Sequence, residues 1–448
     1  MGKLALIAVV GSEDNGVKVE ASEYLKSATL PLFKNFDSKE VSLHAFTKAL
    51  KRLKLCPSEV AMDLLVVACT MYAADTRINR ETFGEDSWTR VIDLYIPVSD
   101  VNLWNKQKQL LETTFKFLTG DVWTINFRAR SVGTPPLSPR GKLQRYGMPY
   151  KTDTVCLFSG GMDSFIGAIN LLAAGVRPLL IGHSKSADVS TYQDKAALSL
   201  AEEYKSLAPL RIDAFIKIHK NNLFASEDHT ERGRSFMFLT IGAICASALG
   251  TKNSKLYMPE NGMISLNLPL TPLRVGSHST RTTHPYYIKQ MQLLFNNLGL
   301  GVEIVNPFQF KTKGEMLSEC ANKALVEKTE TMSCSHPSGR YEGMGNGHCG
   351  SCVPCIIRRA AFHSAKVNDL FPYRRNIYRK SGIQIGKAEG ADILAFKYMI
   401  EKVRKTPNYL TAAIRNTGPL DGNIDNYVSV YSRALIEVEE VIKNVKLT

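Results

Sequence analysis

Short apolar runs alternate with longer segments of helical periodicity between residues 154 and 324. The apolar runs, which we interpret as buried strands, lie at 154–158, 178–182, 212–218, 255–258 and 302–305. The helical patterns lie at 163–174, 192–206, 232–249, 285–299 and 312–324. Strands that alternate with helices predict a parallel, doubly wound α/β sheet, which binds its ligands at the carboxyl ends of the strands.

The rest of the chain falls on either side of this α/β unit. A length of 448 residues exceeds what one ordinary core holds, so we expect several domains. Residues 131–152 contain four prolines and three glycines, a composition typical of a linker. We therefore predict an N-terminal α+β accessory or partner-binding domain at 1–130, a catalytic domain at 153–362 and a helical C-terminal extension at 363–448.

The N-terminal segment carries no evident catalytic constellation. Its apolar patterns predict strands at 4–10, 91–97 and 122–128 and helices at 38–54 and 58–74. The only tryptophans of the chain, Trp88, Trp104 and Trp123, all lie here among apolar neighbours, and we interpret them as core residues.

Apolar runs and cysteine use both predict a cytoplasmic protein without membrane contact. No run approaches the ~18–20 apolar residues that a membrane span needs. The apolar stretch Leu4–Val10 is short and leads into polar residues, so it resembles a strand rather than a secretory signal. Four of the nine cysteines cluster at 334–355, a pattern that fits metal binding in a reducing compartment better than a disulfide framework.

Positive charge is concentrated toward the C-terminus. Residues 331–448 carry 17 Lys and Arg against 10 Asp and Glu, which is +7 of the formal net charge of +14. The segment Tyr373–Lys380, YRRNIYRK, is its densest part. Such a segment is compatible with a nucleic-acid or acidic partner, and equally with a solvated basic face.

The sequence VCLFSGGMDSFIGAIN at 155–170 places small and polar residues between a predicted strand and a predicted helix. Two glycines allow a tight turn whose backbone N–H groups face a ligand, and the helix start carries partial positive charge. This arrangement predicts an anion site, although glycines can also serve turn geometry alone. The residues of the candidate site are Ser159, Gly160, Gly161, Met162, Asp163 and Ser164.

The same loop lacks the lysine of a Walker A motif and instead resembles the Ser-Gly-Gly-x-Asp-Ser pattern of PP-loop ATP pyrophosphatases. That resemblance implies an adenine nucleotide alpha hydrolase-like fold and cleavage of ATP between its α and β phosphates. Asp163 opposes a phosphate unless a cation intervenes, so we expect it either to help arrange Mg²⁺ or to cap the helix.

Four cysteines have the spacing of a metal site. Cys334 is followed by Cys349, Cys352 and Cys355, with Cys-x2-Cys steps that share Cys352. Four thiolates predict a closed, structural Zn²⁺ site. An iron–sulfur cluster is the alternative interpretation, but Arg359 stands where the ferredoxin-type run has its next cysteine.

The loop and the cysteine segment HCGSCVPCIIRRAAF at 348–362 together resemble 7-cyano-7-deazaguanine synthase, the QueC family, over about 155–362. The resemblance implies an ATP-dependent C–N ligase that transfers AMP to the carboxylate of 7-carboxy-7-deazaguanine before an amine attacks. In the family the amine is ammonia, and a second activation yields the nitrile. This chain departs from the family in its first 150 residues, its helical tail and its longer Cys334–Cys349 gap.

The resemblance also suggests further site residues. Lys311 and Lys313 are candidates for offsetting charge at the α-phosphate, or they form a solvated helix start. Arg234 lies in a second family-like segment, and the donor-rich stretch 260–285 is expected near the deazaguanine and ribose. Its candidates are Asn261, Asn267, Arg281 and His284. Because His284 precedes a proline, it is equally suited to the start of a helix.

With its additional N-terminal and C-terminal segments, the chain resembles the QueC-like component of Qat-type anti-phage cassettes. This resemblance implies partner proteins from the same cassette. The N-terminal domain favours a partner-protein amine as the acceptor. Ammonia is an alternative acceptor, and tRNA thiolation or another amidation is an alternative PP-loop reaction. An alternative of another class is a non-catalytic nucleotide-binding adaptor that is stabilised by zinc.

Overall fold

The computed structural model describes residues 2–33, 41–139, 147–183, 187–219, 223–224, 227–228, 230, 232–271, 281–338 and 345–448. The strands are β1 (Lys3–Val10), β2 (Tyr24–Leu32), β3 (Val41–Ser42), β4 (Val91–Val98), β5 (Val122–Ala129), β6 (Thr154–Leu157), β7 (Leu179–Gly182), β8 (Arg211–Asp213), β9 (Lys217–Ile218), β10 (Ser254–Tyr257) and β11 (Val302–Val305).

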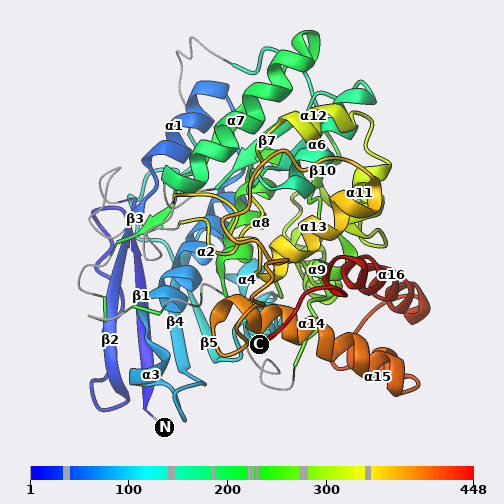
Figure 1. Cartoon of the computed structure of the whole chain (residues 1–448). Coiled ribbons are helices and arrows are strands. Elements are labelled where there is room, and N and C mark those ends of the chain that lie inside the picture. The colour runs from blue at the N-terminus through cyan, green and yellow to red at the C-terminus, as the bar shows by residue number, and fades with distance from the viewer. Residues whose placement is uncertain are drawn as a thin grey trace.

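The helices follow the same order and are coloured along the chain in Figure 1. They are α1 (His44–Leu53), α2 (Glu59–Arg77), α3 (Arg80–Phe83), α4 (Val101–Asn105), α5 (Lys108–Thr119), α6 (Met162–Ala173), α7 (Ala187–Glu203), α8 (Arg234–Ser247), α9 (Gly262–Leu266), α10 (Pro285–Asn297), α11 (Lys313–Ser318), α12 (Lys323–Lys328), α13 (Val353–Ala365), α14 (Ala388–Lys405), α15 (Tyr409–Arg415) and α16 (Ile424–Ile442).

The central sheet has five parallel strands in the order β11-β10-β6-β7-β8. Alternate strand residues point to opposite faces. Val155 and Leu157 join a core built with α8 and α10, whereas Cys156 and Phe158 join one built with α6 and α13. Helices thus cover both faces, which confirms the expected parallel α/β sheet.

This strand order creates a switch point beside β6. From β6 the chain continues to β7 and β8 on one side, and later returns to β10 and β11 on the other. The loops that leave β6 and β10 therefore diverge at the carboxyl edge of the sheet. In open parallel sheets this is where ligands bind.

The N-terminal segment differs from the α+β arrangement that the sequence predicts. Its four strands form a second parallel sheet, in the order β2-β1-β4-β5. The chain can keep these strands parallel because α2 and α3 precede β4, and α4 and α5 connect β4 to β5. The expected helix at 38–54 occupies only α1, since residues 41–42 form β3 and residues 38–40 lie outside the described part.

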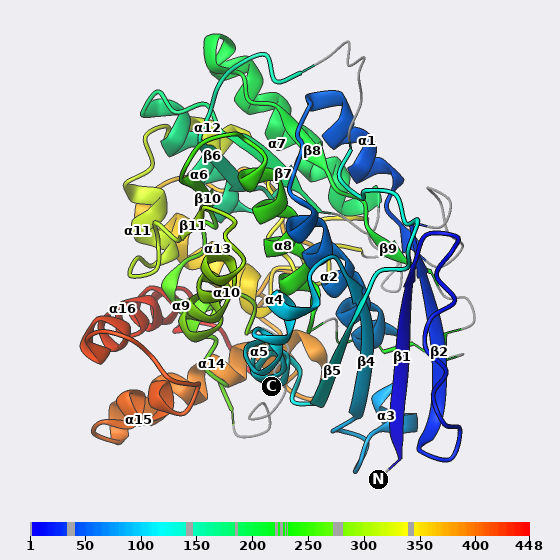
Figure 2. The same cartoon turned by 180° about the vertical axis from the view of Figure 1, so that it is seen from behind.

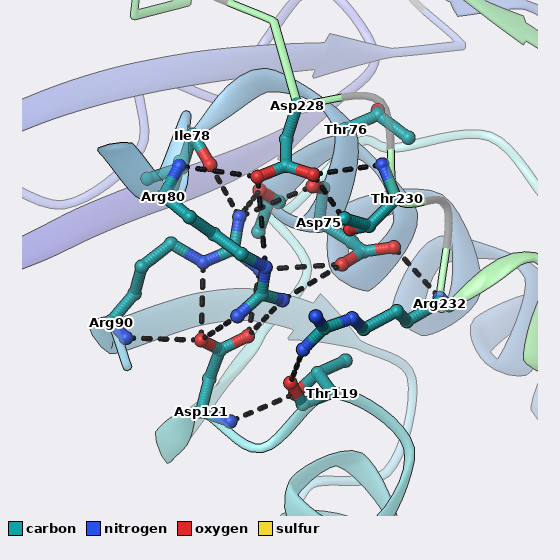
Figure 3. A network of polar contacts seen from close by, with 12 residues as sticks. Asp75, Thr76, Ile78, Arg80, Arg90, Thr119, Asp121, Asp228, Thr230 and Arg232 are labelled. Atoms are coloured by element: carbon teal, nitrogen blue, oxygen red, sulfur yellow. Dashed lines mark hydrogen bonds and ion pairs between the residues drawn. The ribbon is translucent and has the colours of Figure 1, made fainter. Parts of the chain in front are cut away.

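A single hydrophobic core runs from β1 to β11 and joins the two sheets, with α2 packed against α8. The two sheets lie side by side in Figures 1 and 2. Next to this core lies a buried ionic network, drawn in Figure 3. It joins α2, the start of β5 and the residues before α8.

Asp121 is the centre of that network. It accepts hydrogen bonds from Arg80 Nη1 at 2.7 Å and from Arg90 Nη2 at 2.7 Å. Asp75 accepts from the backbone N–H of Gly233 at 2.7 Å, one residue before α8. All of these charged side chains are buried, so each depends on its partners for stabilisation.

The C-terminal helices α14, α15 and α16 form a second core with α9 and α13. In both views α15 and α16 lie at the side of the molecule away from β1 and β2. On α16, Tyr431, Leu435, Val438 and Ile442 are buried and lie at helical spacing, so one face of this helix packs into the core. Within the described residues, no helix combines the length and apolar character that crossing a membrane requires.

Candidate functional site

The glycine loop follows β6 at the switch point. Gly160 has φ +78°, a left-handed conformation that favours glycine, and Gly161 stands just before α6. No side chain caps the start of α6, so its first N–H groups stay available to a ligand. Ser159 is exposed, and its hydroxyl lies 3.2 Å from that of Ser164. The loop thus presents two hydroxyls and an uncapped helix start.

Two neighbouring segments hold this loop in place. Gln193 on α7 donates to the Ser159 carbonyl at 3.2 Å. The backbone N–H of Met332 donates to the Gly160 carbonyl at 2.9 Å. A β-carbon on Gly160 would lie 2.9 Å from Gln193 Cγ, so glycine is needed there for packing as well as for φ.

Asp163 brings three of the sequence-predicted residues together. Lys313, the first residue of α11, lies with its Nζ 2.8 Å from Asp163 Oδ1. Asn261 Nδ2 donates to Asp163 Oδ2 at 2.7 Å. Burial alone would raise the pKa of Asp163, but Lys313 and the hydrogen bonds outweigh it and lower that pKa. Asp163 is therefore held as a carboxylate beside the loop.

Glu260 is a member of this site that the sequence reasoning missed. It follows β10, the strand that pairs with β6, and it is half-buried. Asn261 Nδ2 lies 3.3 Å from Glu260 Oε1 and so bridges Glu260 to Asp163. Burial and the Asp163 charge raise the pKa of Glu260 well above its usual value. Opposite shifts are expected for two adjacent carboxyl groups that share one proton.

The C-terminal extension supports the helix that carries Lys313. Glu437 on α16 accepts hydrogen bonds from the Thr312 hydroxyl and from the Gly314 backbone N–H. A β-carbon on Gly314 would displace the Glu437 carboxylate from this position. Glu315 completes a capping box with Thr312.

Lys311 does not join this group. Its side chain is partly exposed and pairs with Glu319. Arg234 begins α8, and its Nη2 lies 3.4 Å from the carbonyl of His183, the residue after β7. It is thus positioned at the carboxyl edge of the sheet, one strand away from the loop.

The remaining candidates line a separate cavity of about 620 Å³. They are Asn267, Arg281 and His284. His284 caps α10, accepting from the Tyr286 N–H through Nδ1 and bonding Thr417 through Nε2. Both of its ring nitrogens are therefore used inside the protein, which is the helix-start role that its place before a proline allows.

The four cysteines converge as a metal site requires. Their sulfurs all lie within 4.8 Å of one another. The Cys334–Cys352 and Cys349–Cys355 sulfurs are 3.8 Å and 3.9 Å apart. A tetrahedral zinc ion with Zn–S bonds of about 2.3 Å places its sulfurs about 3.8 Å apart. The cluster therefore fits zinc, and with four thiolates it would be structural.

This cysteine cluster is connected to the glycine loop. Arg358, one turn after Cys355 on α13, is fully buried and donates from Nη1 to the Thr331 hydroxyl at 2.8 Å. Its other nitrogens donate to both carboxylate oxygens of Asp369, each at 2.9 Å. Thr331 precedes Met332, which contacts the loop. The cysteine site and the loop therefore share one continuous support.

The basic segment at 373–380 also supports the cysteine region. Arg374 donates to the carbonyls of His336, Pro337 and Gly345. Arg379 donates to Glu389 at 2.5 Å. These two arginines are thus engaged in internal contacts.

Residues 282–366 match the family model described as queuosine biosynthesis protein QueC. The matched part contains Lys313 and all four cysteines but not the glycine loop. No curated protein and no solved structure matched the chain. The match supports a QueC-like family. It suggests an ATP-utilising enzyme of the queuosine or deazapurine type.

Proposed function

We propose that the chain is an ATP-dependent adenylating ligase of the PP-loop type. Its substrate would be 7-carboxy-7-deazaguanine or a close analogue, and its products an amide, AMP and pyrophosphate. The observation that carries the proposal is the meeting of the glycine loop with Asp163, Lys313 and Asn261 at the switch point. Three of these groups come from different parts of the chain, and a turn used only for geometry would not need them.

The reaction has two steps. A carboxylate oxygen of the substrate attacks the α-phosphorus of ATP, and the bond from that phosphorus to the bridging oxygen breaks to release pyrophosphate. The amine nitrogen then attacks the carbonyl carbon of the acyl adenylate, the bond to AMP breaks, and the nitrogen loses a proton. The loop N–H groups and Ser159 would hold the triphosphate, and Lys313 would offset negative charge nearby.

Asp163 and Glu260 are suited to hold Mg²⁺. The two carboxyl groups are adjacent, Asp163 in the first turn of α6 and Glu260 after β10, so they repel each other, and their opposite pKa shifts reflect this. A divalent cation with oxygen ligands would relieve that repulsion. When bound, Mg²⁺ supplies positive charge to the phosphates.

The proposed setting is anti-phage defence, with an amine of a partner protein as acceptor. Two features support this extension. The chain resembles Qat-type components, and the N-terminal segment adds a complete second sheet that a ligase acting on ammonia has no need of. Ammonia would make the chain a 7-cyano-7-deazaguanine synthase instead.

Product analysis tests the proposal. The chain is incubated with ATP, Mg²⁺ and 7-carboxy-7-deazaguanine, together with ammonium or with proteins encoded beside it. We expect AMP, pyrophosphate and a partner protein whose intact mass rises by that of the acylating deazaguanine. Release of amide or nitrile with ammonium alone, at an unchanged partner mass, would favour ammonia. Absence of pyrophosphate in every mixture would favour a nucleotide-binding adaptor.

A further inference from the structure

A cavity of about 620 Å³ lies between α9, the start of α13 and the C-terminal helices. Its volume is in the range that holds a small molecule. One wall comes from α9 and the residues that follow it, such as Leu266 and Leu268. The opposite wall includes Phe396 on α14 and Tyr409 on α15. This second wall belongs to the C-terminal extension, outside the segment that matches the family model.

Two short segments connect the cavity with the glycine loop. Asn261, which bonds Asp163, caps the helix α9, and Met263 on the same helix lines the cavity. On the other side, Met332 contacts Gly160 and His336 lines the cavity four residues later. Four extended residues span at most about 14 Å. The cavity wall at His336 therefore lies within about 14 Å of the residue that contacts Gly160.

The cavity is lined by a cation, Arg281. Arg281 donates to the Phe117 carbonyl at 2.9 Å, and its guanidinium lies 4.5 Å from the centre of the Phe117 ring. No carboxylate of the described residues pairs with it, and the preceding stretch 272–280 contains no acidic residue. Burial lowers the pKa of Arg281. A half-buried cation in largely apolar surroundings is stabilised when an anion binds it.

Other residues that line the cavity are suited to bind a flat molecule with polar groups along its edge. The rings of Phe396, Tyr409 and Tyr431 offer apolar surface. The amides of Asn267 and Asn416 line the same space and make no side-chain hydrogen bond with another described residue. Amides of this kind can donate to and accept from the edge of a heterocycle.

We propose that this cavity holds the acid substrate, a planar heteroaromatic carboxylate, and that α14 and α15 form part of its binding site. Arg281 binds the carboxylate, the aromatic and aliphatic walls enclose the rings, and Asn267 and Asn416 select the polar edge. The proposal rests on the adenylating function proposed above and assigns the substrate to a site built partly by the C-terminal extension.

Calorimetric titration with 7-carboxy-7-deazaguanine, and separately with ATP, tests this assignment. We expect Arg281→Gln and Ala412→Phe to weaken acid binding tenfold or more, with ATP affinity changed less than twofold. Ala412 lines the cavity on α15, whereas its neighbour Thr411 does not, so Thr411→Phe is the matched control and keeps wild-type binding. Circular dichroism checks that each variant folds.

The outcomes separate the two proposals. If the wild type binds the acid and both cavity variants bind it equally well, the cavity assignment is overturned while the ligase function stands. If the wild type releases no pyrophosphate and binds no acid, the ligase function itself fails. Loss of acid binding in Ser159→Ala but not in Arg281→Gln would move the acid to the loop and also overturn the assignment.

Discussion

Lys313 Nζ lies 2.8 Å from Asp163 Oδ1, in a buried ion pair between the first turns of α11 and α6. The pair places a cation and an anion beside a loop that is suited to phosphate. Asn261 fixes the other carboxylate oxygen, so Asp163 cannot rotate away. Glu437 of the last helix fixes the start of α11. Charge at the proposed nucleotide site is thus set by three separate parts of the chain.

Gly160→Ala should weaken ATP binding and lower stability. The new β-carbon would meet Gln193 and would also strain a backbone at φ +78°. Gly175 has the same φ, and a β-carbon added there would meet no neighbouring atom within 4 Å, so Gly175→Ala carries only the backbone strain of about 1–2 kcal/mol. Calorimetry with ATP compares the two variants. Equal ATP affinity in both would show that the packing of Gly160 is unimportant for binding.

A zinc ion held by the four cysteines, as their geometry allows, should support the nucleotide site as well as the fold. Without the metal, α13 loses the anchor of Cys352 and Cys355, and Arg358 no longer holds Thr331 beside the loop. We expect a metal chelator to weaken ATP binding at least tenfold and to lower the melting temperature. Thr331→Val, measured with its zinc content, is the control that breaks the connection while the metal stays. Unchanged ATP affinity in both samples would disprove the connection.

Asp121→Ala should destabilise the N-terminal half. The substitution leaves Arg80 and Arg90 buried without their main carboxylate partner. Breaking a buried ion pair costs about 3–5 kcal/mol. Urea unfolding followed by tryptophan fluorescence reports this half, because all three tryptophans lie in it. Glu401→Ala, at an exposed pair with Lys405, should leave the unfolding midpoint nearly unchanged. A similar midpoint for both variants would contradict the structural role of the network.

Acid should destabilise the protein partly through His284. Burial, assisted by the Arg281 charge, lowers the pKa of His284 from 6.5 to about 3. The unfolded chain therefore takes up a proton below pH 6.5 that the folded chain does not, so this contribution to stability is lost as pH falls from 6.5 toward 3. Between pH 7 and 5.5 the wild type should lose about 1 kcal/mol more than His284→Asn. Parallel pH profiles of unfolding free energy would contradict this.

The parallel sheet and its glycine loop were predictable from the sequence because periodicity and glycines are local signals. The strand β2 was missed, since it is an edge strand whose residues alternate between half-buried and exposed and which contains Pro31. The predicted helix at 312–324 is two helices, α11 and α12, separated around Cys320. Local patterns therefore predicted where helices and strands lie more accurately than where each one begins and ends.

Site residues were harder to find where their role depends on strand order. Glu260 has no local motif, and only the pairing of β10 with β6 brings it to Asp163. Lys311 and Lys313 are equivalent in the sequence, but the turn that starts α11 directs one inward and leaves the other beside Glu319. His284 shows that a donor-rich segment can be used for internal caps. Such distinctions require the tertiary fold.

Exchange of labelled pyrophosphate into ATP tests the central claim most directly, because it reports adenylation without any acceptor amine. We predict exchange in the wild type only when 7-carboxy-7-deazaguanine and Mg²⁺ are both present. Asp163→Asn and Lys313→Met should each lower its rate about 100-fold or more, whereas Lys323→Met on the exposed face of α12 should leave it unchanged. Exchange in Asp163→Asn at the wild-type rate, or no exchange in the wild type with the acid present, would contradict the account.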